Sequence, residues 1–147
     1  MFFDKILVPT DGSEYTKAAA KKAMELAKLS GGEVTALYVM DQTIFTNVPM
    51  DTAVMNVYRT LESEGNSALD YVKNLGKEYD VKVNTELVEG VPVKVILEMS
   101  KDYDIIVIGT LGRTGISKLL MGSVAEKVVR ASKCPVMVVR SPEDDKK

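Results

Sequence analysis

The sequence predicts a doubly wound α/β domain, in which a five-stranded parallel sheet carries helices on both faces. Three observations support this fold class. Short apolar runs alternate with longer segments whose apolar residues recur every three or four positions. The runs are rich in Val and Ile, as buried parallel strands are. Gly, Pro and Asp separate the two kinds of segment. In chain order, strands are expected at 5–9, 33–40, 81–88, 103–108 and 135–140, and helices at 14–30, 52–79, 92–101 and 123–132.

The first half of the chain contains two strands, each followed by a helix. Residues 5–9 are an apolar run that ends in turn and N-cap residues, so this strand is expected to lead into a helix. Apolar residues at helical spacing continue that helix to Ser30, and Gly31 with Gly32 supplies a C-cap. After the second strand, the apolar loop 41–51 is of a kind that often covers a ligand or a partner.

The next elements show the same alternation. Residues 52–79 carry a single apolar stripe and predict a long helix, which Gly65 or Gly76 could make irregular. Residues 81–88 alternate between apolar and polar side chains, as a half-covered edge strand does. Pro92 then stands near the first position of a helix, where its missing N–H costs nothing.

The last third of the chain supplies the final two strands. Residues 103–108 are nearly all apolar, which is typical of a central parallel strand buried on both faces. A helix from Ser123 and a last apolar strand, 135–140, complete the pattern. Length and composition indicate one domain over residues 1–147, with the polar segment 141–147 as a loose tail.

Charge and composition exclude several classes of function. A net charge of −2, from 19 basic and 21 acidic residues, gives no field that would favour nucleic acid or an anionic membrane. No apolar run approaches the ~18 residues of a membrane span, and no signal-peptide pattern is present, so a cytoplasmic protein is expected. The chain has no histidine and a single cysteine, Cys134, which removes imidazole catalysis and Cys/His zinc sites. Any metal would be a hard, oxygen-bound cation such as Mg²⁺ or Mn²⁺.

Ligands of open parallel sheets bind beyond the carboxyl ends of the strands, where the strand order reverses. Two loops have suitable chemistry. Pro9, Thr10 and Asp11 follow the first strand, and Ile108 and Gly109 end the fourth. The Asp11 carboxylate is an acceptor for sugar hydroxyls or for a water-bridged metal. A sheet ordered 3-2-1-4-5 would bring the two loops together, although the sequence pattern does not prove that order.

A phosphate site is predicted after the fourth strand. Glycines there would keep side chains away from a ligand, and a second glycine before a helix leaves the first helical amides free to attract an anion. An arginine would offset the phosphate charge. The candidate residues are Gly109, Gly112, Arg113, Gly122, Ser123 and Val124. At the end of the second strand, Val39 and Met40 would border an adenine with apolar contacts and backbone polar groups.

These features also have structural explanations. Ser123 and Glu126 have the spacing of a capping box, in which both side chains satisfy the first amides of their own helix. A Glu126 that stays near those amides would repel a phosphate, so a phosphate site requires either a metal ion or a displaced Glu126. Asp11 is equally suited to cap the first helix, and Arg113 taken alone is more often a solvated loop charge.

Several segments together carry a family resemblance, and they span nearly the whole chain. They are Ile-Leu-Val-Pro-Thr-Asp-Gly-Ser at 6–13, Gly90-x-Pro92, Asp-Ile-Ile-Val-Ile-Gly at 104–109, Gly109-x2-Gly112-x9-Gly122-Ser123, and Cys-Pro-Val-Met-Val-Val-Arg at 134–140. The chain resembles a universal stress protein of the ATP-binding type. The glycine pattern is fairly specific, because the branch of that family that does not bind ATP lacks it.

The resemblance implies a Rossmann-like sheet ordered 3-2-1-4-5 and a homodimer that pairs the last strand, Pro135 to Arg140, with its copy. It also implies ATP, usually with a divalent metal on the phosphates. Matched by position, Pro9, Thr10, Asp11 and Val39 would hold the adenosine part. The phosphates would lie against Gly109, Gly112, Gly122, Ser123 and Val124.

Two nucleotide functions remain open at this point. The first is a nucleotide-dependent sensor or regulatory module in the stress response, which needs no catalytic residue. The second is a slow ATPase or a nucleotidyl-transferring enzyme, in which Asp11 or Glu126 would have to activate water because no histidine is available. A purely structural dimer with an ordinary capped helix is a third, weaker alternative.

Overall fold

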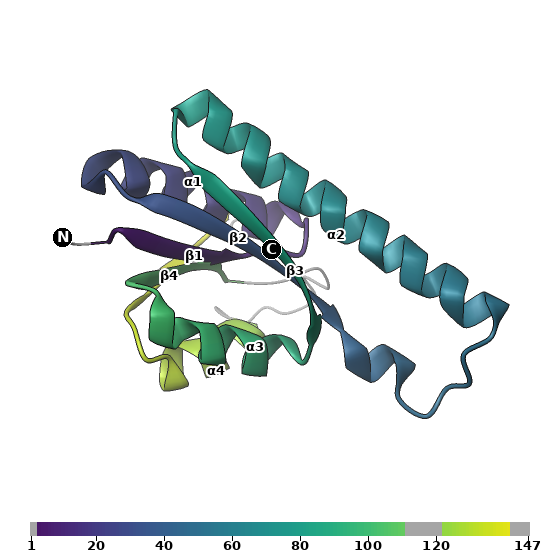
Figure 1. Ribbon diagram of the computed structural model, residues 1–147. Coiled ribbons are helices and arrows are strands. Elements are labelled where there is room, and N and C mark those ends of the chain that lie inside the picture. Colours follow the sequence, from purple (N-terminus) through teal and green to yellow (C-terminus); the bar gives the residue numbers. More distant parts are fainter. Residues whose placement is uncertain (1–2, 111–121, 142–147) are drawn as a thin grey trace.

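The computed structural model describes residues 3–110 and 122–141, which form a five-stranded parallel sheet between two layers of helices (Figure 1). The strand order is β3-β2-β1-β4-β5, which confirms the predicted doubly wound topology. In chain order the elements are β1 (Lys5–Pro9), α1 (Glu14–Ser30), β2 (Glu33–Asp41), the 3-10 helix η1 (Gln42–Phe45), α2 (Thr52–Tyr79), β3 (Val83–Gly90), α3 (Pro92–Met99), the 3-10 helix η2 (Ser100–Asp102), β4 (Ile105–Gly109), α4 (Ser123–Ala131) and β5 (Val136–Val139).

Two apolar cores lie on opposite faces of the sheet. Helices α1 and α2 cover one face, and α3 and α4 cover the other (Figure 1). Strand β1 contributes to both, because successive side chains of a strand point to opposite faces: Ile6 and Val8 belong to the first core, and Leu7 to the second. All five residues of β4 are buried, as predicted for a central parallel strand.

Helix α1 shows why the sequence pattern located its elements well. Ser13 is the N-cap, and its hydroxyl oxygen accepts a hydrogen bond from the Thr16 amide. At the other end Gly31 has a φ of 73°, a left-handed conformation that an L side chain rarely adopts, and its amide bonds to the Ala27 carbonyl. These two ends agree with the predicted start and C-cap.

Helix α2 is continuous, so the expected irregularity at Gly65 or Gly76 is wrong. Both glycines allow the helix to lie close to the sheet. A Cβ at Gly65 would lie 2.8 Å from the side chains of Leu87 and Tyr38, and one at Gly76 would lie 2.3 Å from Val83 Cγ2. The glycines therefore serve helix-to-sheet packing and do not bend the helix.

The apolar segment after β2 contains the short helix η1, where a loop was expected. The Asp41 carboxylate caps it by accepting a hydrogen bond from the Thr43 amide at 3.0 Å. Ile44 in this helix is 51% exposed. That this segment covers a ligand or a partner stays a prediction. Tyr58 of α2 lies beside Phe45 of η1, and its hydroxyl donates to Glu89 of β3, a bond that raises the pKa of Tyr58.

The end of the described chain is packed against the fold. Ser141, the first residue of the expected loose tail, is buried at 3% exposure, and residues 142–147 lie outside the described part. Within residues 3–110 and 122–141, no helix combines the length and the apolar character needed to cross a membrane.

Candidate functional site

Strands β1 and β4 diverge at their carboxyl ends, which is where the order of the sheet reverses. They pair through Ile6 with Ile105 and Leu7 with Ile106. Beyond these residues each strand bonds to its outer neighbour. The Thr10 amide donates to the Leu37 carbonyl of β2 at 2.8 Å, and the Thr110 amide donates to the Val139 carbonyl of β5 at 3.2 Å. We call this divergence the switch point, and it is the place where sheets of this topology bind ligands.

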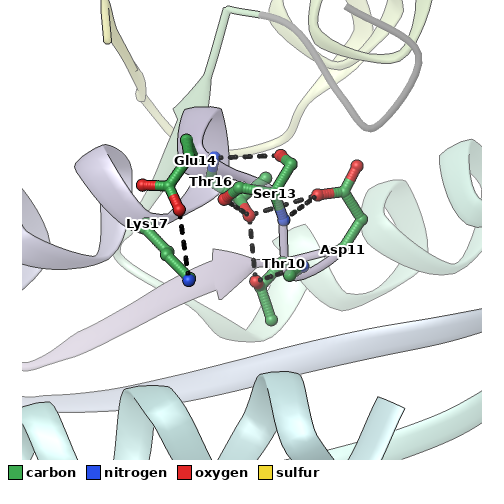
Figure 2. A network of polar contacts seen from close by, with 7 residues as sticks. Thr10, Asp11, Ser13, Glu14, Thr16 and Lys17 are labelled. Atoms are coloured by element: carbon green, nitrogen blue, oxygen red, sulfur yellow. Dashed lines mark hydrogen bonds and ion pairs between the residues drawn. The ribbon is translucent and has the colours of Figure 1, made fainter. Parts of the chain in front are cut away.

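On the β1 side of the switch point, residues 10–13 form a network of polar contacts (Figure 2). Asp11 Oδ1 accepts hydrogen bonds from the Ser13 amide at 2.9 Å and from the Thr16 hydroxyl at 3.2 Å. Asp11 Oδ2 accepts none from any residue that the structure describes, and Figure 2 shows it directed away from the network. Asp11 therefore presents one open acceptor, because its other oxygen is already used.

Ser13 caps the N-terminus of α1, a role for which Asp11 was also considered. Its hydroxyl oxygen accepts the Thr16 amide at 3.4 Å, so Ser13 and not Asp11 is the N-cap of α1. Asp11 stands two residues earlier and closes an Asx turn through the Ser13 amide. The Asp11 carboxylate is thus held in place without being consumed as the cap.

Gly109, at the end of β4, has a packing role that the sequence did not reveal. A Cβ at this position would lie 2.7 Å from the backbone oxygen of Tyr15, in the first turn of α1. Residues 105 and 107 also face α1, so position 109 points toward the same helix. The glycine lets α1 approach the end of β4, and this contact brings the α1 network beside the β4 side of the switch point.

On the β4 side, helix α4 begins without a side-chain cap. Its N-cap is Gly122, whose amide donates to the Thr110 carbonyl at 2.5 Å, so the start of α4 is tied to the end of β4. Ser123 and Val124 are exposed, and in the described residues their amides have no hydrogen-bond partner. Such a helix start carries a partial positive charge and favours an anion.

The capping box considered from the sequence is not formed. Gly122, and not Ser123, is the N-cap, so Glu126 stands one position too far along the helix. Its carboxylate Oε1 pairs with Arg130 Nη2 at 2.9 Å, toward the other end of α4. Glu126 is therefore turned away from the first amides. A phosphate site required either this displacement or a metal ion.

The remaining predicted residues differ in the faces they occupy. Val39 and Ile108 belong to the core beneath α3 and α4, and Pro9, two residues after Leu7, shares that face. Met40 is buried at 3% exposure in the opposite core, beneath α1 and α2. A ligand at the switch point could reach the side chain of Val39 more readily than that of Met40. Met40 would then contact such a ligand through its backbone groups.

Two predicted residues, Gly112 and Arg113, lie outside the described residues. Thr16 is not among the predicted site residues, and its hydroxyl contacts Asp11, Ser13 and Thr10. The available signal was a threonine three residues after Ser13, since a hydroxyl in the first turn of a helix can bond to groups of the preceding turn. Within the described ranges, no cluster of three acidic or cysteine side chains has the arrangement of a metal site.

Comparison with known proteins identifies the family. The family model described as "Universal stress protein family" matches residues 2–140. The chain belongs to the universal stress protein family. The universal stress protein MJ0531 of Methanocaldococcus jannaschii is 42% identical over 145 residues, which cover 97% of this chain and 85% of that protein.

Solved structures agree with this assignment. Protein MJ0577, also a universal stress protein of Methanocaldococcus jannaschii, superposes with a TM-score of 0.82 at 31% identity and covers 95% of this chain and 97% of its own. A universal stress protein family member from Arabidopsis thaliana, solved with AMP bound, has a TM-score of 0.72 at 20% identity and covers 97% of this chain and 95% of its own. At that identity the second likeness supports the Rossmann-like fold alone.

Proposed function

We propose that this universal stress protein binds ATP at the switch point and acts in the cytoplasm as a nucleotide-dependent sensor or regulatory module of the stress response. The observation that carries the proposal is the opposite chemistry of the two sides of the switch point. One side offers an open carboxylate oxygen on Asp11, and the other offers the uncapped start of α4. A nucleotide has a hydrogen-bond donor at its sugar and negative charge at its phosphates, so it matches both sides in one orientation only.

The Asp11 side suits a sugar. A carboxylate oxygen accepts hydrogen bonds and repels phosphate, so a ribose hydroxyl is the group of a nucleotide that fits Oδ2. Apolar side chains of Pro9, Val39 and Ile108 share one face of the sheet near this end and would border the adenine. The AMP complex of the Arabidopsis relative is consistent with an adenine nucleotide as the ligand class.

The α4 side suits phosphates. The amides of Ser123 and Val124 with the dipole of α4 would hold phosphate oxygens, and the lack of a side chain on Gly122 would let them approach. Gly112 is proposed as a further phosphate contact on the basis of the family pattern, and Arg113 because its charge would offset that of the phosphates. A Mg²⁺ or Mn²⁺ ion would be carried by the phosphates themselves, which supply the hard oxygen ligands that such ions prefer.

The chemistry of the site favours binding over cleavage. A hydrolase needs a group that activates water, and the chain has no histidine. In the proposed complex both oxygens of Asp11 are engaged, Oδ1 by two donors of the protein and Oδ2 by the sugar, and Glu126 is paired with Arg130. No residue is therefore assigned a catalytic role, and ATP occupancy itself is proposed as the signal.

We further propose a homodimer through β5. This strand is at the edge of the sheet, and Met137 remains 37% exposed. The Ile106 amide bonds to the Pro135 carbonyl and the Thr110 amide to the Val139 carbonyl, so the backbone groups of Val136 and Val138 point to the open edge. A short apolar edge of this kind is a template for pairing with a second copy.

The nucleotide proposal is tested with protein freed of bound ligand by unfolding and refolding. A ligand that binds only the folded state adds RT ln(1 + [L]/Kd), so ATP with Mg²⁺ at about 100 Kd is expected to add roughly 2.7 kcal/mol of stability. At about 2–4 °C per kcal/mol for a chain of this size, the melting temperature should rise by roughly 5–10 °C. No rise with ATP, ADP or AMP would reject the proposal.

Phosphate release by the same sample separates the sensor from the enzyme. A binding module is expected to leave ATP intact over many times the lifetime of the complex. Steady release that is lost in Asp11→Asn but kept in variants outside the site would favour the slow ATPase, which remains the competing function.

A further inference from the structure

The two buried threonine hydroxyls beneath the β1 loop form a connected chain of hydrogen bonds. Thr10 Oγ1 and Thr16 Oγ1 lie 3.1 Å apart, and both residues are only 7% exposed. The Gly12 amide donates to Thr10 Oγ1 at 3.2 Å. Thr16 Oγ1 in turn lies 3.2 Å from Asp11 Oδ1 and 3.0 Å from the Ser13 carbonyl (Figure 2). These hydrogen bonds therefore connect the Gly12 amide to the Asp11 carboxylate.

The protons of the two threonine hydroxyls determine which group donates and which accepts in each of these hydrogen bonds. Each hydroxyl has one proton to donate. Among the described contacts, Thr16 Oγ1 is the acceptor within reach of the Thr10 proton. The Thr16 proton then has two acceptors, and the charged carboxylate forms the stronger bond. Asp11 Oδ1 thus receives the Thr16 hydroxyl and the Ser13 amide, which leaves the acceptor capacity of the carboxylate on Oδ2.

The backbone of α1 also fixes the hydroxyl of Thr16. A threonine in a helix has few χ1 states, and one of them is stabilised by bonding back to a carbonyl of the preceding turn. Thr16 adopts that arrangement, with Oγ1 3.0 Å from the Ser13 carbonyl, so the one proton that it donates to Asp11 Oδ1 also lies close to this carbonyl. The hydroxyl is therefore already oriented toward Asp11 before a ligand arrives.

We propose that Thr16 is a positioning residue of the nucleotide site, which acts through Asp11 to make the protein select a ribose over a deoxygenated sugar. By holding Oδ1, the Thr16 hydroxyl keeps Oδ2 facing outward as a lone acceptor, and a ligand is bound well only if it brings a sugar hydroxyl to that oxygen. The inference rests on the proposed function, because it needs a nucleotide whose sugar lies at Asp11.

Loss of the Thr16 hydroxyl is therefore expected to change the preference for ribose over a deoxygenated sugar, and not merely the affinity for the nucleotide. Without the Thr16 hydroxyl, only the Ser13 amide holds Oδ1 and the carboxylate has more freedom to rotate, so the sugar hydroxyl loses part of its bond, whereas a ligand without that hydroxyl has nothing to lose. A side chain that only supported the fold would weaken both ligands alike. The ratio of the two affinities therefore separates positioning from a general structural role.

The experiment measures Kd by calorimetry for ATP and for 2′,3′-dideoxy-ATP, each with Mg²⁺, on four proteins. Wild type is expected to prefer ATP by about tenfold or more, the value of one good hydrogen bond. Thr16→Val keeps the shape of the side chain and removes the hydroxyl, so the preference should fall to about twofold with little change for the dideoxy ligand. Thr16→Ser, which keeps the hydroxyl, should restore most of the preference.

The fourth protein is a matched control. Thr35 is a buried threonine of β2, at 5% exposure, and pairs with Leu7 toward the amino half of the sheet. Thr35→Val makes the same chemical change away from the switch point, so it should leave the preference for ATP at the wild-type value. If Thr16→Val does not fold, Thr10→Val with Thr10→Ser as its rescue tests the same chain of hydrogen bonds.

The outcomes separate the two proposals. A wild type that binds neither ligand rejects the proposed function and the inference with it. A wild type that binds both ligands equally keeps nucleotide binding but overturns the positioning role. An unchanged ratio in Thr16→Val, or an equal loss for both ligands, also overturns it.

Discussion

The carbonyl of Thr110 accepts a hydrogen bond from the amide of Gly122 at an N···O distance of 2.5 Å. This bond joins the end of β4 to the start of α4, so the helix begins at the reversal point of the sheet. The first amides of α4 come after β4, and the carboxylate of Asp11 comes after β1. They lie at the same edge of the sheet because β1 and β4 are neighbours in the strand order.

Gly122→Val is expected to abolish the rise in melting temperature caused by ATP while the protein still folds. The backbone of Gly122 has φ −76° and ψ 169°, an extended conformation that any residue adopts, so the substitution causes no backbone strain. The branched side chain would stand where phosphates approach the helix start. Gly122→Ala, with a smaller side chain, should show a partial loss. Thermal melts with and without ATP make the comparison, and a full ATP response in Gly122→Val counts against the phosphate site.

Arg130→Ala should weaken ATP binding by about two- to fivefold, although Arg130 is near the far end of α4. Without its partner, the Glu126 carboxylate is free to turn back toward the first amides and repel phosphate. Glu126→Gln removes that charge and is expected to bind ATP at least as well as wild type. Both effects should shrink at about 0.5 M salt, because the pair is solvent-exposed. Weaker binding by Glu126→Gln would contradict this account.

Gly109→Ala should cost about 1–3 kcal/mol of unfolding free energy, because its Cβ would press on the backbone of α1. That Cβ would lie 2.7 Å from the Tyr15 oxygen, and backbone cannot move aside as a side-chain end can. Displacing the first turn of α1 also moves Thr16, so ATP affinity should fall together with stability. Urea unfolding and calorimetry measure the two quantities. Wild-type stability in Gly109→Ala would contradict a close contact between position 109 and the backbone of α1.

Val138→Pro is expected to convert the proposed dimer into a monomer that still binds ATP. The N–H of Val138 points to the open edge of β5, so proline removes a bond to a second copy without breaking the ladder to β4. Light scattering after gel filtration gives the mass of both proteins, and ATP binding reports the integrity of the fold. A monomeric wild type, or a variant that stays dimeric and folded, would exclude β5 as the interface.

Sequence patterns located the fold closely because local signals and burial agree. The bounds of β1, α1 and α2 were predicted as observed, since caps, turn glycines and apolar periodicity mark the same residues. β3 was placed two residues early, because Val81 continues its alternation although pairing with β2 starts later, at Val83. The pattern within a segment cannot show where its partner strand begins.

The binding residues named from the sequence stay a prediction, and the sequence did not show the interactions that these residues make within the protein. Asp11 and Ser123 were weighed as helix caps from spacing alone, and the structure gives those places to Ser13 and Gly122. The assignment of Gly109 to a ligand stays a prediction, and the structure adds a packing role, because a Cβ there would meet the backbone of α1. Thr16 was missed because its contacts, although within six residues along the chain, depend on the geometry of the turn between β1 and α1 and not on periodicity. Contacts between elements, unlike periodicity, are not written in local sequence.

The central claim is that a nucleotide bridges the β1 loop and the start of α4, and a titration of ¹⁵N-labelled protein with ATP and Mg²⁺ tests it most directly. The largest amide shift changes are expected at Gly12, Ser13, Ser123 and Val124. The amides of Glu33 and Asp104, which bond to Asp4 and Lys5 at the amino edge of the sheet, should stay unchanged. Shift changes gathered at the amino edge, or confined to only one of the two sides of the switch point, would contradict the account.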